Sequence, residues 1–392
     1  MNLSAAVNGV IQRGTATLTI TDATTAQPGY VPLTPFRLLD TRSGIGAPAA
    51  IAAAGSTTEV QVAGRGGVVA TAKAVALNVA VTEPKSSGFV TAYPCGTTRP
   101  TTGNLNYVAG QTISNLVVIG LPENGKVCLF TSDETHLVAD VDGYFSKDSD
   151  FVPMAPRRLV DTRTAVSPAI KVPAGSTLTV QVASRFGIPD DAKAASLNVT
   201  VVDPDASGFL TTYPCGTTRP TASSLNYLSG QTIPNAALAK LSTSGTVCIF
   251  TQRAAHIVVD VSGWFPATTD FRTLSPERLL DTRSGVGHPP AGLVPAGQVV
   301  ELKVTGVGSS NIPADAGAVV LNVTATQAQQ AGFVTVFPCG EARPTAASLN
   351  YPAGGTINNA VISKVGAGGK VCLYTQRATH LVVDVNGWFP RT

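Results

Sequence analysis

The run Ala195-Ser196-Leu197-Asn198-Val199-Thr200-Val201 alternates apolar and polar side chains without a break. Successive residues of a β-strand point to opposite faces of the sheet, so this alternation is typical of a strand with one apolar face. The runs at 176–182 and 256–261 have the same period. Glycine and proline separate such runs at short intervals, and no long amphipathic helical pattern lies between them. The sequence predicts an all-β fold of short strands.

The same pattern occurs three times in the 392 residues. Each copy runs from an Arg-Leu-Leu/Val-Asp-Thr-Arg motif to a Gly-Tyr/Trp-Phe motif and spans about 120 residues, the size of a complete small domain. About seven to nine short strands in each copy favour an antiparallel β-sandwich or jelly-roll-like domain. We therefore expect a leader at 1–30 and three tandem repeats at 31–150, 151–270 and 271–392.

The leader contains one strand-like alternation of threonine with apolar residues, at 14–22. A lone strand cannot satisfy its own backbone, so this single N-terminal strand must pair with a repeat, a neighbouring chain or another domain. The junctions at 147–150 and 267–270 are short and polar, and they predict repeats held in a fixed relation. An extended rod of three domains is the simplest arrangement, and a closed pseudo-threefold arrangement is the alternative.

The composition excludes several kinds of partner. Charged residues make up 13% of the chain, and the net charge of +3 is dispersed rather than clustered. A nucleic-acid-binding surface needs a concentrated basic patch, so we expect no nucleic-acid partner. No stretch has the length and apolarity of a membrane span, so we expect none.

The six cysteines occur as one pair per repeat, and the two members are always 33 residues apart. This arrangement predicts three disulfides within the repeats, and hence an oxidising, extracellular location. Six free buried cysteines are one alternative. A site of two cysteines and one histidine for zinc is another, although it lacks the usual short spacing. The expected pairs are Cys95 with Cys128, Cys215 with Cys248, and Cys339 with Cys372.

A histidine and an aspartate lie four residues apart near the end of each repeat: His136 and Asp140, His256 and Asp260, His380 and Asp384. On a strand, residues four apart share a face but stand about 13 Å from each other. That distance is too long for a hydrogen-bonded dyad or for two ligands of one metal ion. We expect each group to bond a different neighbour in a structural role.

The Asp-Thr-Arg element places an aspartate and an arginine on one side of a strand. Arginine pairs well with carboxylates, and a buried carboxylate needs such a partner. We expect salt bridges that join the first and last strands of each repeat; an anion or glycan site is the alternative. The candidates are Asp40, Arg42 and Asp140, then Asp161, Arg163 and Asp260, and then Asp281, Arg283 and Asp384.

Each repeat also has an Arg-Pro segment followed by Leu-Asn-Tyr. A planar ring, an amide and a guanidinium are groups from which sugar sites are built, although a tyrosine at the end of a strand more often packs in the core. The candidate ligand contacts are Arg99, Asn106 and Tyr107, then Arg219, Asn226 and Tyr227, and then Arg343, Asn350 and Tyr351. Asn115, Asn235 and Asn359 place further amides near them.

The sequence contains none of the common catalytic or nucleotide-binding motifs, such as Gly-x-Ser-x-Gly, His-Glu-x-x-His or a phosphate-binding glycine loop. We therefore expect no enzyme activity, no catalytic residue, no bound metal and no cofactor.

Taken together, the Arg-Leu-Leu-Asp-Thr-Arg, Tyr-Pro-Cys-Gly, Leu-Asn-Tyr and Val-Asp-Val-x-Gly-Trp-Phe motifs resemble a β-module of exported actinobacterial proteins. That module often occurs in tandem, beside hydrolases or other surface domains. The resemblance covers 31–392; the first copy departs from it at Ala80 and Tyr144, and the third at Phe337 and Gly355. It implies secretion and an accessory role, and it assigns no functional site.

The main hypothesis is a secreted structural or adhesive surface protein, a stalk or filament subunit that assembles through its N-terminal strand. Its partners would be further copies of the chain or other surface proteins. The alternative is a tandem carbohydrate-binding array that gains avidity from its repeats.

Overall fold

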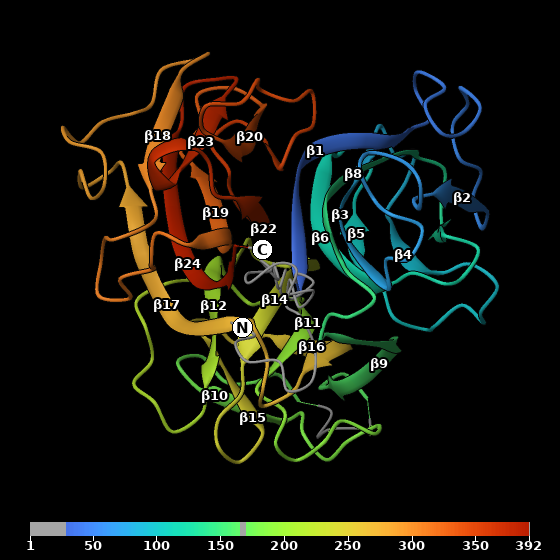
Figure 1. Ribbon diagram of the computed structural model, residues 1–392, viewed down its shortest axis with the longest axis horizontal. Helices are drawn as coiled ribbons and strands as arrows, with labels where there is room; N and C mark the ends of the chain where they lie inside the picture. The colour runs from blue at the N-terminus through green and yellow to red at the C-terminus, as the bar shows by residue number, and fades with distance from the viewer. Residues whose placement is uncertain (1–28, 165–169, 392) are drawn as a thin grey trace, which may run out of the picture.

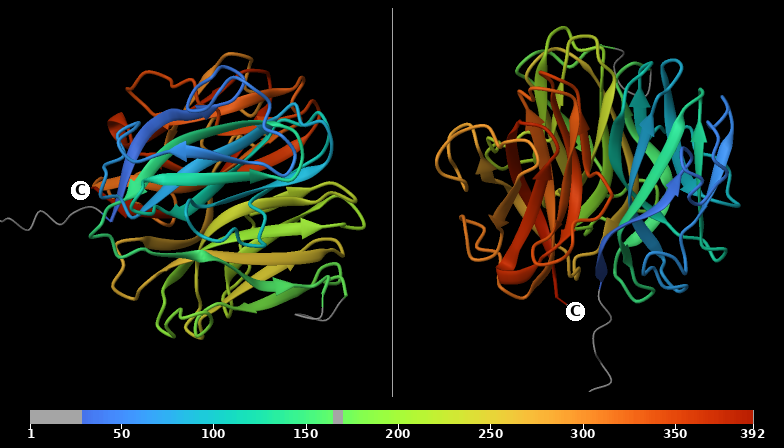
Figure 2. Two further views of the ribbon diagram at one scale, coloured as in Figure 1. Left: turned by 90° about the vertical axis from the view of Figure 1, so that its right-hand side faces the viewer. Right: turned by 90° about the horizontal axis from the view of Figure 1, so that it is seen from above.

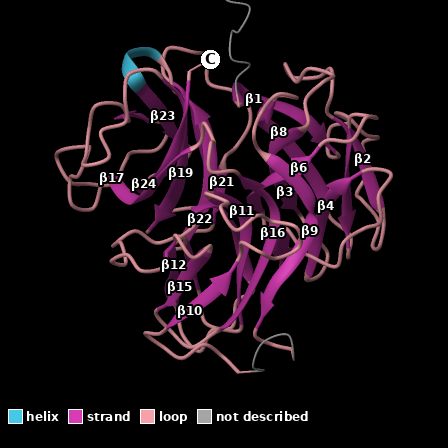
Figure 3. Ribbon diagram, turned by 60° about the horizontal axis from the view of Figure 1, so that its bottom comes forward, coloured by secondary structure: helices cyan, strands magenta, loops and turns pink. Residues whose placement is uncertain are grey.

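The computed structural model describes residues 29–164 and 170–391. This part of the chain contains 24 β-strands and one short 3-10 helix, η1 (Ala367–Gly369) (Figure 3). The predicted all-β class is confirmed. The predicted leader strand at 14–22 lies outside the described residues. No helix among those residues has the length and apolarity needed to cross a membrane.

Each repeat contributes eight of these strands. The first contains β1 (Tyr30–Asp40), β2 (Thr57–Gln61), β3 (Ala74–Thr82), β4 (Gly88–Pro94), β5 (Leu105–Tyr107), β6 (Ile113–Gly120), β7 (Lys126–Thr131) and β8 (His136–Phe145). The second contains β9 (Val152–Asp161), β10 (Thr177–Gln181), β11 (Ala194–Val202), β12 (Gly208–Pro214), β13 (Leu225–Tyr227), β14 (Ile233–Lys240), β15 (Thr246–Thr251) and β16 (His256–Phe265). The third contains β17 (Arg272–Asp281), β18 (Val299–Lys303), β19 (Ala316–Thr326), β20 (Gly332–Pro338), β21 (Leu349–Tyr351), β22 (Thr356–Lys364), β23 (Lys370–Thr375) and β24 (His380–Pro390).

The strands of a repeat form two four-stranded antiparallel sheets, so the molecule has six. One sheet, here called the inner sheet, has the order β1-β8-β3-β6, β9-β16-β11-β14 or β17-β24-β19-β22. The other, the outer sheet, has the order β2-β7-β4-β5, β10-β15-β12-β13 or β18-β23-β20-β21. Valine, leucine and isoleucine side chains from both sheets of a repeat are buried together in its core.

The six sheets form a propeller-like ring, with the three inner sheets around its axis (Figures 1 and 2). Six aromatic rings pack at this axis in a closed cycle, with neighbouring centroids 4.4 to 5.0 Å apart. Each repeat supplies one ring at or beside the start of its first inner strand and one at the end of its last. In cyclic order they are Tyr30, Phe145, Phe151, Phe265, Phe271 and Phe389.

Hydrogen bonds between asparagine side chains also join the three repeats in a closed cycle. The side-chain nitrogen of Asn115 donates to Asn198 Oδ1 at 2.9 Å, which joins the first repeat to the second. Asn235 donates to Asn322 at 3.0 Å, and Asn359 donates to Asn78 at 2.9 Å, which returns to the first repeat. The expected rod is therefore wrong, and the closed pseudo-threefold arrangement is the observed one.

The burial of the inner strands explains why the ring closes. All nine residues of β3 are buried, and β11 and β19 are buried almost throughout. One face of these strands packs on the outer sheet of the same repeat, and the other packs on the neighbouring repeats. A sheet with two faces to cover gains apolar burial only when other sheets cover the second face.

Candidate functional site

The three predicted disulfides are present: Cys95–Cys128, Cys215–Cys248 and Cys339–Cys372. Their Cα atoms are 5.0, 4.9 and 5.0 Å apart. In each case the first cysteine directly follows β4, β12 or β20, and the second lies on the neighbouring strand β7, β15 or β23. Each bridge therefore ties two adjacent strands of an outer sheet.

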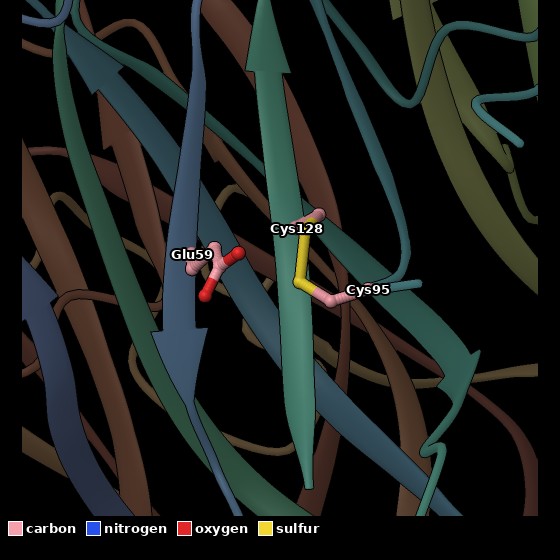
Figure 4. Close-up of side chains that lie close together, drawn as sticks. All are labelled: Glu59, Cys95 and Cys128. Carbon is pink, nitrogen blue, oxygen red and sulfur yellow. A yellow bond between two sulfur atoms is a disulfide. The ribbon is translucent and has the colours of Figure 1, made fainter. Parts of the chain in front are cut away.

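The carboxylate of Glu59 lies beside the first disulfide, with its oxygen within 4.8 Å of both sulfur atoms (Figure 4). The sulfur atoms are bonded to each other and are not thiolates, the form that binds a metal ion. Glu59 accepts a hydrogen bond from Lys126 at 2.8 Å. The alternative of a zinc site with two cysteine ligands is therefore wrong, because all six cysteines are in disulfides. His136 Nδ1 lies 3.0 Å from the Thr41 hydroxyl.

The predicted link between the first and last strands of each repeat exists, but its arginine is a different one. Asp260 accepts hydrogen bonds from Arg158, at 2.6 Å from Nε and 3.3 Å from Nη2. Arg158 also donates to Asp161 at 2.7 Å. Arg163, the arginine expected to make this link, donates instead to Asp161 at 2.8 and 2.7 Å.

The same correction applies to the other repeats. Arg37 bonds Asp140 and Asp40, and Arg278 bonds Asp384 and Asp281. Arg42 and Arg283 donate to the aspartate two residues before them. The cause is a register shift between residues 37 and 39 and its equivalents. The resulting bulge turns an arginine three residues before the aspartate to the same side, where a regular strand would place it on the opposite one.

The two carboxylates of this cluster have opposite pKa shifts. Hydrogen bonds from Arg163 hold the pKa of Asp161 at about 2. Burial raises the pKa of Asp260, and the bonds from Arg158 oppose that rise. The cluster thus combines two guanidinium groups with two carboxylates, and the Arg163 side chain is its most exposed member, at 43%.

The tyrosines that we considered as ligand contacts are core residues. Tyr107, Tyr227 and Tyr351 are 3%, 2% and 2% exposed. The Tyr107 hydroxyl lies 2.7 Å from that of Thr131, and the other two pair equivalently with Thr251 and Thr375. Because these rings are enclosed by protein, they cannot stack on a ligand. The prediction of ligand contact is wrong for the tyrosines.

Arg99, Arg219 and Arg343 are exposed and lie over aromatic rings of the outer sheets. Their guanidinium carbons are 3.6, 3.9 and 3.7 Å from the ring centroids of Phe130, Phe250 and Tyr374. Such cation–π contacts hold a guanidinium in place at the surface. Phe89, Phe209 and Phe333 pack beside these rings, with centroids 5.9 to 6.0 Å apart. Sequence reasoning did not single out these six aromatic residues.

A cavity of about 200 Å³ lies at the boundary between the first and second repeats. The first repeat lines it with Phe89 and Asn106, and the second lines it with Arg158, Arg163 and Asp260. The salt-bridge residues and the Leu-Asn-Tyr segment, predicted as separate features of each repeat, therefore meet across the boundary. A rod would not predict the contact between β5 of the first repeat and β14 of the second. We call this cavity the 1/2 groove.

A larger cavity of about 670 Å³ lies where Val31 and Pro32 of β1 meet the third repeat. Among its charged side chains, Lys364 donates to Glu341 at 2.6 Å, so these two neutralise each other. Glycine residues of the 366–369 segment form much of the remaining wall. The 1/2 groove offers more varied side-chain chemistry, and it is the stronger candidate site.

No family profile and no curated protein matches the chain. Among solved structures, two archaeal virus structures align with it. One is described as "The Triple Jelly Roll Fold and Turret Assembly in an Archaeal Virus"; it has 9% identity, covers 86% of this chain and 84% of that chain, and has a TM-score of 0.21. The other is "Life in the extremes: atomic structure of Sulfolobus Turreted Icosahedral Virus", with 9% identity, 87% and 86% coverage and a TM-score of 0.22. TM-scores this low do not establish a common fold.

Proposed function

We propose that the chain is a rigid structural and adhesive module of the cell exterior. The observation that carries the proposal is the closed ring, in which two cycles of contacts join all three repeats. Three disulfides support the extracellular part, because such bonds persist in oxidising compartments. The resemblance of 31–392 to a module of exported actinobacterial proteins supports secretion and an accessory role. The proposal includes no catalytic activity.

The proposal treats the inner and outer sheet of each repeat as one β-sandwich domain of the jelly-roll kind. Supporting this view, the two sheets share a buried core and a disulfide ties adjacent strands of the outer one. A closed ring of three such domains is not itself an extended stalk. A stalk or filament would have to arise from association between rings.

The proposed route to association is addition of the leader strand at 14–22 to a sheet of another copy. An edge strand leaves unpaired backbone groups that an incoming strand can satisfy. The test compares the full chain with one lacking residues 1–28, by light scattering and electron microscopy. We expect the full chain to form larger assemblies and the shortened chain to be monomeric.

A matched variant keeps the length of the leader and removes its ability to pair. Leu18→Pro with Ile20→Pro takes away backbone donors in the middle of the predicted strand. This variant should behave like the shortened chain. A full chain that stays monomeric at all concentrations would refute the filament part of the proposal, and the ring would then act as a single adhesive unit.

A second candidate function is carbohydrate binding. The observation that favours it is the 1/2 groove, which combines an aromatic ring, an amide and an Arg–Asp cluster.

A further inference from the structure

The three repeat boundaries are equivalent by position, so each one serves as a control for the others. The Asn106 position of the first repeat corresponds to Asn226 in the second. At the boundary of the second and third repeats, Asn358 accepts hydrogen bonds from the backbone and side-chain nitrogens of Asn226, at 2.8 and 3.2 Å. There, the side-chain nitrogen of the Leu-Asn-Tyr asparagine has a protein acceptor.

At the 1/2 groove this partner is missing. Pro234 occupies the position that corresponds to Asn358. Pro234 lies opposite Thr200 in the inner sheet of the second repeat. Proline has no side-chain acceptor. Within 29–164 and 170–391, no residue forms a hydrogen bond with the Asn106 side chain, which lines the cavity half-buried. Its donors and its acceptor are available to a ligand.

A second polar side chain of the 1/2 groove, Thr232, also lacks the partner that its equivalents have in the other repeats. In the third repeat the hydroxyls of Thr326 and Thr356 lie 2.6 Å apart, and in the first those of Thr82 and Thr112 lie 2.7 Å apart. The second repeat has Val202 at the first of these positions, so Thr232 loses its partner. Both Val202 and Thr232 line the 1/2 groove, and the Thr232 side chain is exposed.

The charged residues of the groove indicate what kind of ligand fits. Arg158 and Arg163 are balanced by Asp161 and Asp260, so the cluster carries no excess charge to attract an anion. It offers guanidinium donors close to carboxylate acceptors. Hydroxyl groups both donate and accept, and they match such a mixed wall.

Phe89 supplies an apolar surface at the edge of the groove. Phe89 is 37% exposed, and Gly103, which has no side chain, lies against it in the lining of the groove. An exposed ring beside polar side chains suits a sugar, whose ring presents an apolar C–H face and a rim of hydroxyls. The volume of about 200 Å³ lies below the usual range for drug-sized ligands, so it suits a single small ring.

We propose that the 1/2 groove binds one neutral sugar ring per chain, through Phe89, Asn106, Thr232 and Arg163. This rests on the second candidate function, carbohydrate binding, and specifies its ligand and its place; it does not depend on self-association. It also differs from an array of equal sites, because the asparagine and the threonine lack partners together only at the 1/2 groove. Asn226 is paired with Asn358 at the boundary of the second and third repeats, and Thr112 is paired with Thr82 at the boundary of the third and first.

The test uses saturation-transfer and titration NMR on the whole chain. The probes are the methyl glycosides of glucose, galactose, mannose and N-acetylglucosamine, with glucuronic acid as the anionic comparison. We expect at least one neutral glycoside to bind with one-to-one stoichiometry and more tightly than glucuronic acid.

The decisive variant is Val202→Thr with Pro234→Asn, which copies residues that the chain itself uses in its third repeat. It should pair Thr232 and Asn106 with protein and weaken binding about tenfold or more, with the melting temperature kept. Asn106→Ala should weaken binding similarly, and the control Asn226→Ala should leave the Kd within about twofold. The proposal is overturned if no neutral glycoside binds or if glucuronic acid binds better. It is also overturned if the double variant Val202→Thr with Pro234→Asn binds like the original chain.

Discussion

Arg278 connects two carboxylates of the third repeat, and one of them is deeply buried. Its Nε donates to Asp384 at 2.7 Å, and its Nη1 donates to Asp281 at 3.1 Å. The Asp384 side chain is 1% exposed. Removing one member of a buried ion pair leaves an uncompensated charge, which costs about 3 to 5 kcal/mol. We expect Arg278→Met to lower the free energy of unfolding by that amount, measured by urea titration.

Arg283 provides the matched control, because its guanidinium bonds the same Asp281 from a position that is 45% exposed. Exposed ion pairs contribute about 1 kcal/mol or less. Arg283→Met should therefore cost far less than Arg278→Met. Adding Asp384→Asn to Arg278→Met should recover part of the loss, since it removes the unpaired charge. Equal costs for the two single variants would contradict the assigned roles.

Asp142 provides a test of pH dependence. It lies on β8 at a register shift and is 5% exposed, and burial raises its pKa well above the usual value, with Asp140 adding to the rise. A raised carboxyl pKa means that the folded state binds the proton more tightly than the unfolded state. Stability from this group is therefore present below about pH 4 and is lost as the pH rises toward the folded pKa.

The variant Asp142→Asn copies Asn386, which occupies the same position in the third repeat. It should be more stable than the original chain at neutral pH, and the difference should shrink as the pH falls toward 4. Comparing the two proteins at each pH cancels the opposite contributions of Asp40, Asp161 and Asp281, whose pKa values are lowered. A difference that grows toward acid would contradict this prediction. Thermal melts between about pH 4 and pH 8 measure it.

Single residues were predictable where spacing alone determined the partner. The cysteine pairs recur at one separation, and that was enough to place the disulfides. The role of Arg37 was missed because period-two reasoning puts residues 37 and 40 on opposite faces. A bulge, which leaves no clear mark in the sequence, brings them together.

At the scale of the element, strands with one covered face have the alternating burial that their sequence predicts. In β2, β10 and β18 exposed residues alternate with more buried ones. The inner strands alternate in sequence but not in burial: Ser196, Asn198 and Thr200 of β11 are 2%, 9% and 6% exposed. Their polar face contacts a neighbouring repeat: Asn198 of the second repeat donates to the Gly103 carbonyl of the first at 2.8 Å.

A signal for this second covered face was present in the inner strands. Along β3 the positions between the large apolar residues hold Ala74, Ala76, Asn78 and Ala80, with no charged side chain among them. Strands that face water usually carry charged or long polar residues there. Small neutral residues on the second face indicate close packing, and in tandem repeats they favour a ring over a rod. The register across the boundaries, and hence the 1/2 groove, still required the structure.

At the scale of the whole molecule, closure implies that the repeats unfold together. The aromatic and amide cycles bury side chains from all three repeats at one axis, so no repeat can leave without exposing the others. We expect a single calorimetric transition whose van't Hoff enthalpy equals the calorimetric enthalpy. Phe265, a fully buried member of the aromatic cycle, belongs to that shared core. Phe265→Ala should lower the midpoint of the whole transition, at a cost of about 3 to 5 kcal/mol.

A rod of independent domains would behave differently in two measurements. It would unfold in steps, with a van't Hoff enthalpy about a third of the calorimetric one, and Phe265→Ala would affect only one step. Its radius of gyration would also clearly exceed the roughly 21 Å expected for a compact body of this length. X-ray scattering at a concentration where the chain is monomeric therefore separates the two arrangements. Because adhesion through a fixed set of surfaces requires the repeats to keep their relative positions, a flexible rod would remove the physical basis of the proposed role.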